Sequence, residues 1–178
     1  MQLSEAIASR MNHDLSGSVC AAQNAVQLLD MSGTPAEKAE AVRLIADAAA
    51  AVATRLKFLR MMFGAPQPID AGIVRDYLKL LNPAIALDGA VSSRLQLTCV
   101  SVLAHTVMGK SKISVKPDAV IAEGMVRMSP DSKKILQGGT AEISPINAMT
   151  FWVMEQAKDA KKMIHLAVSE QKIKITLV

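Results

Sequence analysis

His13 and Asp14 are adjacent residues whose side chains could do chemistry together. A carboxylate beside an imidazole can hydrogen-bond one ring nitrogen, fix the tautomer and make the other nitrogen a better nucleophile. Ser16 and Gly17 follow one helical turn later and would leave space beside the ring for a partner. Arg10, one turn earlier, could face an anionic group held on the imidazole. These residues predict nucleophilic chemistry centred on His13, with Asp14 orienting the ring.

No second catalytic motif supports this reading. The sequence has no G-x-S-x-G, P-loop, C-x-x-C, H-E-x-x-H or G-x-G-x-x-G pattern. A single histidine on a helix is most often an ordinary surface residue, and on the residues alone that alternative stays open. His105 and His165 are interpreted as structural, and Cys20 and Cys99 as buried free thiols, because they match no metal or redox spacing. We therefore expect no metal site and no cofactor.

Two long amphipathic helices are predicted to position His13. Residues 3–30 and 39–62 carry apolar side chains at steps of three and four. Between them, Gly33 can end the first helix, and Thr34 with Pro35 can begin the second. So short a connection makes the helices antiparallel. Such a hairpin cannot bury both apolar stripes alone, so we expect a homodimer that forms a four-helix bundle. The alternative is packing against the rest of the chain.

Helix geometry also predicts the orientation of His13. It lies about 200° around the helix from Met11 and Leu15, which belong to the apolar stripe. The imidazole should therefore point to solvent, where a partner protein can reach it.

The sequence pattern changes after Pro66-Gln67-Pro68. Helices are expected at residues 69–81, 95–107 and 144–160, and strands at 113–116, 120–128, 164–168 and 172–177. Residues 130–139 are polar and are expected to contain at most one helical turn. Helices mixed with strand pairs predict an α+β sandwich, with helices on one face of a sheet. We expect two domains, a helical hairpin at residues 1–65 and the sandwich at residues 67–178.

Composition argues against two classes of partner. The net charge is only +4, aromatic residues make up 3% of the chain, and the only tight basic cluster is Lys158, Lys161 and Lys162. A nucleic-acid-binding module would need clustered charge and stacking aromatics. The uncharged runs fall short of the roughly 20 apolar residues that a spanning helix requires, and the first residues lack the apolar core of a signal peptide. We expect a soluble, cytoplasmic protein without a nucleic-acid or membrane partner.

The segment His13-Asp14-Leu15-Ser16-Gly17-Ser18-Val19 resembles the phosphotransfer helix of bacterial two-component proteins. Together with Gln23-Asn24-Ala25-Val26-Gln27-Leu28-Leu29, it resembles ChpT-type histidine phosphotransferases more closely. The likeness covers the whole chain in outline, as a helical hairpin followed by a degenerate domain like the ATP-binding domain of histidine kinases. It departs at Ser18, where the family usually has proline, so an expected helix distortion is missing.

The resemblance implies a phosphorelay. His13 would take a phosphoryl group from the aspartate of one response-regulator receiver domain and pass it to the aspartate of another. The exposed residues expected around it on the docking surface are Arg10, Asp14, Gly17, Gln23 and Asn24.

The resemblance also implies that residues 67–178 have lost ATP. Ser101 and His105 stand where a kinase has the asparagines that hold magnesium and phosphates. No glycine-rich phosphate loop appears between Ile113 and Ile143. Two alternatives remain, a non-catalytic dimeric pseudo-kinase that antagonises a kinase, and an active kinase with an unusual nucleotide site.

Overall fold

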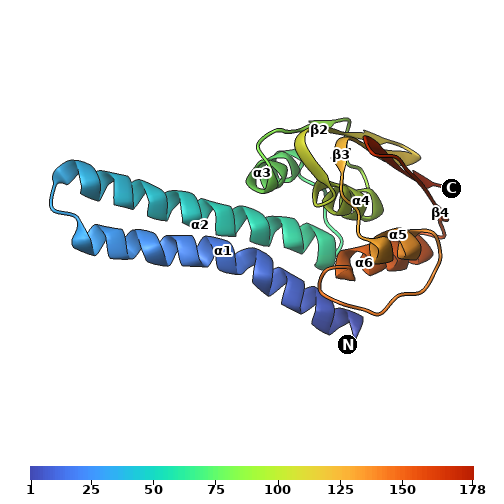
Figure 1. The fold of residues 1–178 in the computed structure, drawn as a ribbon, viewed down its shortest axis with the longest axis horizontal. Coiled ribbons are helices and arrows are strands. Elements are labelled where there is room, and N and C mark those ends of the chain that lie inside the picture. The colour runs from blue at the N-terminus through green and yellow to red at the C-terminus, as the bar shows by residue number, and fades with distance from the viewer.

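The computed structural model describes residues 1–178 as two long helices followed by a five-stranded sheet with four further helices (Figure 1). The helices are α1 (Leu3–Met31), α2 (Pro35–Phe63), α3 (Ala71–Leu81), α4 (Arg94–Ala104), α5 (Pro130–Leu136) and α6 (Ala148–Asp159). The strands are β1 (Ile85–Asp88), β2 (Val107–Lys116), β3 (Ala119–Val126), β4 (Ile164–Val168) and β5 (Lys172–Leu177). The expected α+β architecture is confirmed.

Helices α1 and α2 form the predicted antiparallel hairpin (Figure 1). A capping box begins α2: the Thr34 side chain accepts a hydrogen bond from the Glu37 amide at 3.2 Å, and the Glu37 carboxylate accepts one from the Thr34 amide at 2.9 Å. Pro35 occupies the first turn, where its missing amide proton costs no hydrogen bond. The turn is therefore encoded by local sequence.

Small residues form the contact between the two helices. Ser18 and Ala25 of α1 are buried, as are Ala41 and Ala48 of α2, and each pair is seven residues apart. That spacing keeps one face of each helix turned to the other, and the small side chains let the helices approach closely. Larger apolar side chains on the hairpin remain exposed, among them Val19, Val26, Val42 and Leu56. The hairpin does not cover its own apolar surface.

The sheet has the strand order β1-β2-β3-β5-β4, with β1 parallel to β2 and the other neighbours antiparallel. Helices α3 to α6 lie on one face of it (Figure 1). Every residue of α4 from Leu95 to Ala104 is buried, so this helix forms the centre of the core. The two C-terminal strands have the predicted bounds.

Several predicted element bounds were wrong, for local reasons. Residues 130–139, expected to contain at most one helical turn, contain the seven-residue α5, which the Ser129 side chain caps by accepting from the Ser132 amide at 3.1 Å. The strand expected at 120–128 ends at Val126. The helix expected at 95–107 ends at Ala104. The strand expected at 113–116 begins already at Val107, and the bulge and the positive φ of Gly109 interrupt the alternating pattern by which its first half could have been predicted. The helix expected from Ser144 begins only at Ala148. The Asn147 side chain accepts from the Ser144 amide at 2.9 Å and donates to the Glu142 carbonyl at 2.9 Å, which holds the preceding residues as a loop.

The end of α2 is part of the same core as the C-terminal region (residues 67–178). Phe58, Met61 and Met62 are buried in the cluster that contains α4 and the inner face of the sheet. Phe58 stacks on Tyr77 of α3, with ring centroids 3.7 Å apart and planes 8° from parallel. The N-terminal part of α1 also contacts the C-terminal region, where it lies against α6 (Figure 1). Packing is thus continuous across the proposed domain boundary. None of the helices is both long and apolar enough to cross a membrane.

Candidate functional site

His13 lies on an uninterrupted stretch of α1, with 82% of its side chain exposed. Its Nδ1 is 3.4 Å from Oδ1 of Asp14, whose side chain is only 17% exposed. An ionised carboxylate only accepts hydrogen bonds, so this contact favours the tautomer that carries its proton on Nδ1. At 3.4 Å the contact is long for a hydrogen bond. The Nε2 lone pair is left open to solvent, as the helix geometry predicted.

Asp14 is held from both helices of the hairpin. Its Oδ2 accepts a hydrogen bond from Nε of Arg10 at 3.1 Å. On α2, Nη1 of Arg55 donates to the backbone carbonyl of Asp14, while Nε of Arg55 is buried without a partner. Arg10 therefore holds the carboxylate that faces His13, and Arg55 holds the backbone that carries it.

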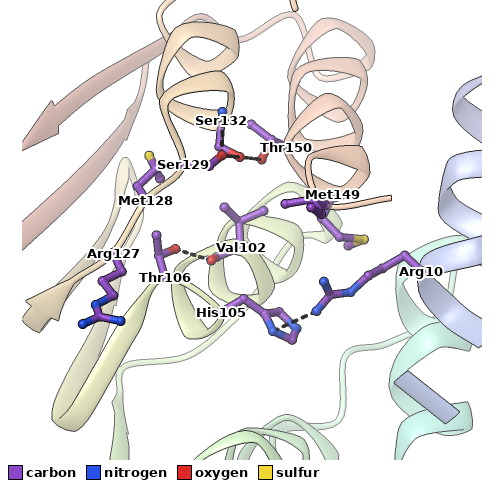
Figure 2. Close-up of a pocket in the computed structure, with 11 residues that line it drawn as sticks. Arg10, Val102, His105, Thr106, Arg127, Met128, Ser129, Ser132, Met149 and Thr150 are labelled. Atoms are coloured by element: carbon purple, nitrogen blue, oxygen red, sulfur yellow. Dashed lines mark hydrogen bonds between the residues drawn. The ribbon is translucent and has the colours of Figure 1, made fainter. Parts of the chain in front are cut away.

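The sequence suggested that Arg10 could face an anionic group held on His13. In the structure its side chain turns away from His13. Its side chain is 22% exposed and points to the end of α4, where Nη2 lies 3.2 Å from Nδ1 of His105 (Figure 2). This guanidinium joins the hairpin to the C-terminal region.

His105 was wrongly expected to be a core or half-buried histidine: its residue is exposed, although both ring nitrogens have a partner. Arg10 approaches Nδ1, and the hydroxyl of Tyr77 lies 3.3 Å from Nε2. Loss of hydration among the surrounding protein groups, followed by the nearby Arg10 charge, lowers the pKa of His105 to about 4. Burial, with a smaller contribution from Asp14, raises the pKa of Tyr77 to about 12. Both groups are neutral near pH 7.

The other predicted docking residues lie along α1 beyond His13. Gly17 and Asn24 line a groove of about 550 Å³ between α1 and α2, together with Ala21, Leu28 and Leu44. Gln23 is exposed outside the groove. A Cβ added at Gly17 would meet no atom within 4 Å, so packing within the chain does not require glycine there.

Cys20 was wrongly expected to be buried. It is exposed, because seven residues from His13 return it to within about 20° of the same helix face. Cys99 is buried as expected, and burial raises the pKa of its thiol to about 12.

A cavity of about 190 Å³ lies beside His105, where the ends of α4 and β3 meet α5 and α6 (Figure 2). Arg10 and Arg127 line it at different sides, and the hydroxyls of Ser129, Ser132 and Thr150 hydrogen-bond to one another rather than into the space. Pockets for drug-sized ligands measure roughly 300–1,000 Å³, so this one is small for a nucleotide. No group of three or more His, Cys, Asp or Glu residues is placed to hold a metal ion.

Comparison with known proteins gives a structural likeness without a sequence match. No family model matches the chain, and no curated protein matches it. A solved bacterial phosphotransferase has a TM-score of 0.78, with 22% identity over 99% of this chain and 95% of that one. The two share a fold. This confirms the expected resemblance at the level of architecture.

Two histidine kinases also align, at scores too low to carry an argument. The Acinetobacter baumannii kinase AdeS has a TM-score of 0.38, with 15% identity over 93% of this chain and 95% of that one. The kinase ShkA has a TM-score of 0.40, with 14% identity over 97% of this chain and 45% of that one.

Sequence reasoning missed Arg55, Tyr77 and the partnership of His105 with Arg10. The spacing of Arg55 could have identified it. It lies seven residues after Ala48, as Ala48 does after Ala41, and it therefore places a charged side chain on the helix face that otherwise carries small residues. No sequence pattern identifies Tyr77 and His105, because their contacts are with residues distant in the sequence.

Proposed function

We propose that the protein is a histidine phosphotransferase in a two-component phosphorelay. It passes a phosphoryl group between receiver-domain aspartates through a phosphohistidine at His13, without using ATP. The geometry of His13 carries this proposal, because one ring nitrogen faces Asp14 and the other is open to solvent. The fold shared with a bacterial phosphotransferase supports it.

The transfer step follows from that geometry. A receiver bearing an aspartyl phosphate docks on the hairpin, and the Nε2 lone pair of His13 attacks phosphorus in line. The N–P bond forms as the bond between phosphorus and the aspartate oxygen breaks, and the receiver's carboxylate leaves. The imidazole gains positive charge, which the Asp14 carboxylate stabilises at Nδ1. Transfer to the second receiver reverses these bond changes. The receivers would supply magnesium, and this chain positions the nucleophile.

The receiver docks on the exposed face of α1 around His13. Gly17 leaves room beside the ring, and Asn24 with Gln23 extends the surface along the helix. Arg10 contributes by holding Asp14 rather than by contacting the phosphoryl group.

A second copy of the chain covers the exposed apolar face of the hairpin. Val19 and Val26 of α1 are seven residues apart, and Val42 and Leu56 of α2 are fourteen apart, so each pair lies along one line of its helix. A four-helix bundle would bury them. Analytical ultracentrifugation at micromolar concentration should give a dimer, which Val26→Glu dissociates and Lys57→Ala leaves intact. A monomeric wild type would contradict the bundle.

The C-terminal region serves partner choice and support rather than nucleotide binding. The small cavity beside His105 and the paired hydroxyls that line it favour this view. Isothermal titration with magnesium and ATP tests it, and measurable magnesium-dependent binding would show instead an active kinase with an unusual site.

The decisive experiment mixes the protein with the complete set of receivers encoded in its source genome, each charged with radiolabelled acetyl phosphate. Wild type should acquire a label that is stable to base and lost in acid, and His13→Ala should acquire none. His165→Ala, an exposed histidine on β4, is the matched control and should label normally. An unlabelled wild type would refute the relay and favour the non-catalytic pseudo-kinase. Full labelling of His13→Ala would refute the site.

A further inference from the structure

An unbroken series of polar contacts joins the C-terminal region to His13. The Tyr77 hydroxyl lies 3.3 Å from Nε2 of His105. Nδ1 of His105 lies 3.2 Å from Nη2 of Arg10 (Figure 2). Nε of Arg10 donates to Oδ2 of Asp14 at 3.1 Å, and Oδ1 of Asp14 lies 3.4 Å from Nδ1 of His13. These contacts link α3 and the end of α4 to α1.

Because arginine only donates, its position in this series indicates which group donates at each contact. A guanidinium only donates, so Nδ1 of His105 must accept from Arg10. The neutral ring then carries its proton on Nε2 and donates it to the Tyr77 oxygen. Arg10 donates at its other end to Asp14, which accepts again from His13. A protonated His105 could not accept from Arg10, so the series requires the neutral ring.

The charges around His105 favour that neutral form. Arg10 approaches from α1 and Arg55 from α2, and both disfavour a second positive charge. Asp14 is the acidic group near it, and Tyr77 of α3 is a neutral phenol. Desolvation acts in the same direction as the arginines.

His105 restrains an otherwise mobile side chain. Arg10 and Asp14 form an i,i+4 pair, and such a pair contributes little by itself on a helix surface. An arginine side chain has many rotamers, and the entropy lost in selecting one opposes any single geometry. Because Nη2 is held by His105, the Nε–H stays aimed at Oδ2, and Oδ1 of Asp14 stays turned to His13.

We propose that His105 is a positioning residue for the chemistry of His13, acting through Arg10 and Asp14. This positioning role rests on the proposed phosphotransfer function. In this arrangement the C-terminal region sets the tautomer and orientation of a nucleophile on the other part of the chain. That gives the region a role in the transfer step that needs no nucleotide.

Two variants of His105 test this role. His105→Ala removes the acceptor for Arg10, whereas His105→Gln keeps an acceptor oxygen and an N–H donor on one side chain. In His105→Ala, nitrogen-detected NMR should show His13 losing its Nδ1–H tautomer, and kcat for transfer from a phosphorylated receiver should fall roughly tenfold with KM unchanged. His105→Gln should restore most of both, and the His165→Ala control should change neither.

A purely structural role for His105 predicts other results. If folded His105→Ala keeps the His13 tautomer and kcat, or if KM alone changes, the positioning role is wrong. Should His105→Ala fail to fold, Tyr77→Phe replaces it, because the ring stacked on Phe58 is kept and only the hydroxyl that fixes His105 is lost. The tautomer measurement needs no receiver. It therefore decides the positioning role even if wild type accepts no phosphoryl group, a result that would refute the proposed function separately.

Discussion

Phe58 is the side chain whose loss should most directly separate the hairpin from the C-terminal region. It is fully buried near the end of α2 and stacks on Tyr77 at a centroid distance of 3.7 Å. Truncation to alanine would leave a ring-sized void between α2 and α3 and remove one face of the phenol that contacts His105.

The expected cost follows from that burial. Core Phe→Ala changes destabilise by about 3–5 kcal/mol, and a stacked aromatic pair contributes about 0.5–1.5 kcal/mol beyond its buried area. We expect Phe58→Ala to lower the free energy of unfolding by about 4 kcal/mol, a large share of the roughly 5–15 kcal/mol typical of whole domains.

Urea unfolding followed by circular dichroism measures this change. Leu80→Ala is the matched control, because Leu80 is an apolar residue of α3 that is 37% exposed, and it should lose well under 1 kcal/mol. A loss below 1 kcal/mol in Phe58→Ala would refute the continuous core. So would two separate transitions in the wild type, since a shared core makes the hairpin and the C-terminal region unfold together.

Three further changes test separate parts of the site. Ser18→Pro should cost about 3 kcal/mol by thermal unfolding, because Ser18 lies inside the uninterrupted α1; an unchanged Tm would mean that α1 tolerates the family's proline. The free energy of unfolding should fall as pH falls from about 6.5 to about 4, since the unfolded state binds the His105 proton first. His105→Gln should weaken that dependence, and an identical profile would contradict it. Gly17→Ala should stabilise α1 slightly yet raise KM for a receiver, because the added Cβ meets no atom of this chain within 4 Å and would obstruct a docking partner; an unchanged KM would place docking elsewhere.

The sequence predicted the elements that depend on local signals. The hairpin followed from periodicity and from Gly33, Thr34 and Pro35, and the last two strands from alternation about a turn. The start of β2 was hidden by the bulge near Gly109, and β1 is only four residues long, too short for a pattern to distinguish strand from loop.

The same division applies to the site. The exposure of His13 and its contact with Asp14 depend on positions within one helix, so they can be predicted from the sequence. The contact between Arg10 and His105 joins residues 95 apart and depends on how α4 lies against α1. A long side chain has many rotamers, and only the tertiary structure selects the one that faces His105.

In the proposed relay, the position of Arg10 bears on reversibility. A carrier must release the phosphoryl group as readily as it accepts it, so a fixed cation at the phosphoryl oxygens would favour the phosphohistidine and slow the second transfer. Arg10 points to Asp14 and His105, and Arg55 points to the Asp14 carbonyl, so neither of these arginines is aimed at the open Nε2 of His13. Arg10 acts on the Nδ1 side of the ring, through the Asp14 carboxylate that faces it, and Arg55 holds the backbone of Asp14. Stabilisation of the transferring group is thereby left to whichever receiver is docked, and each receiver can draw the group toward itself.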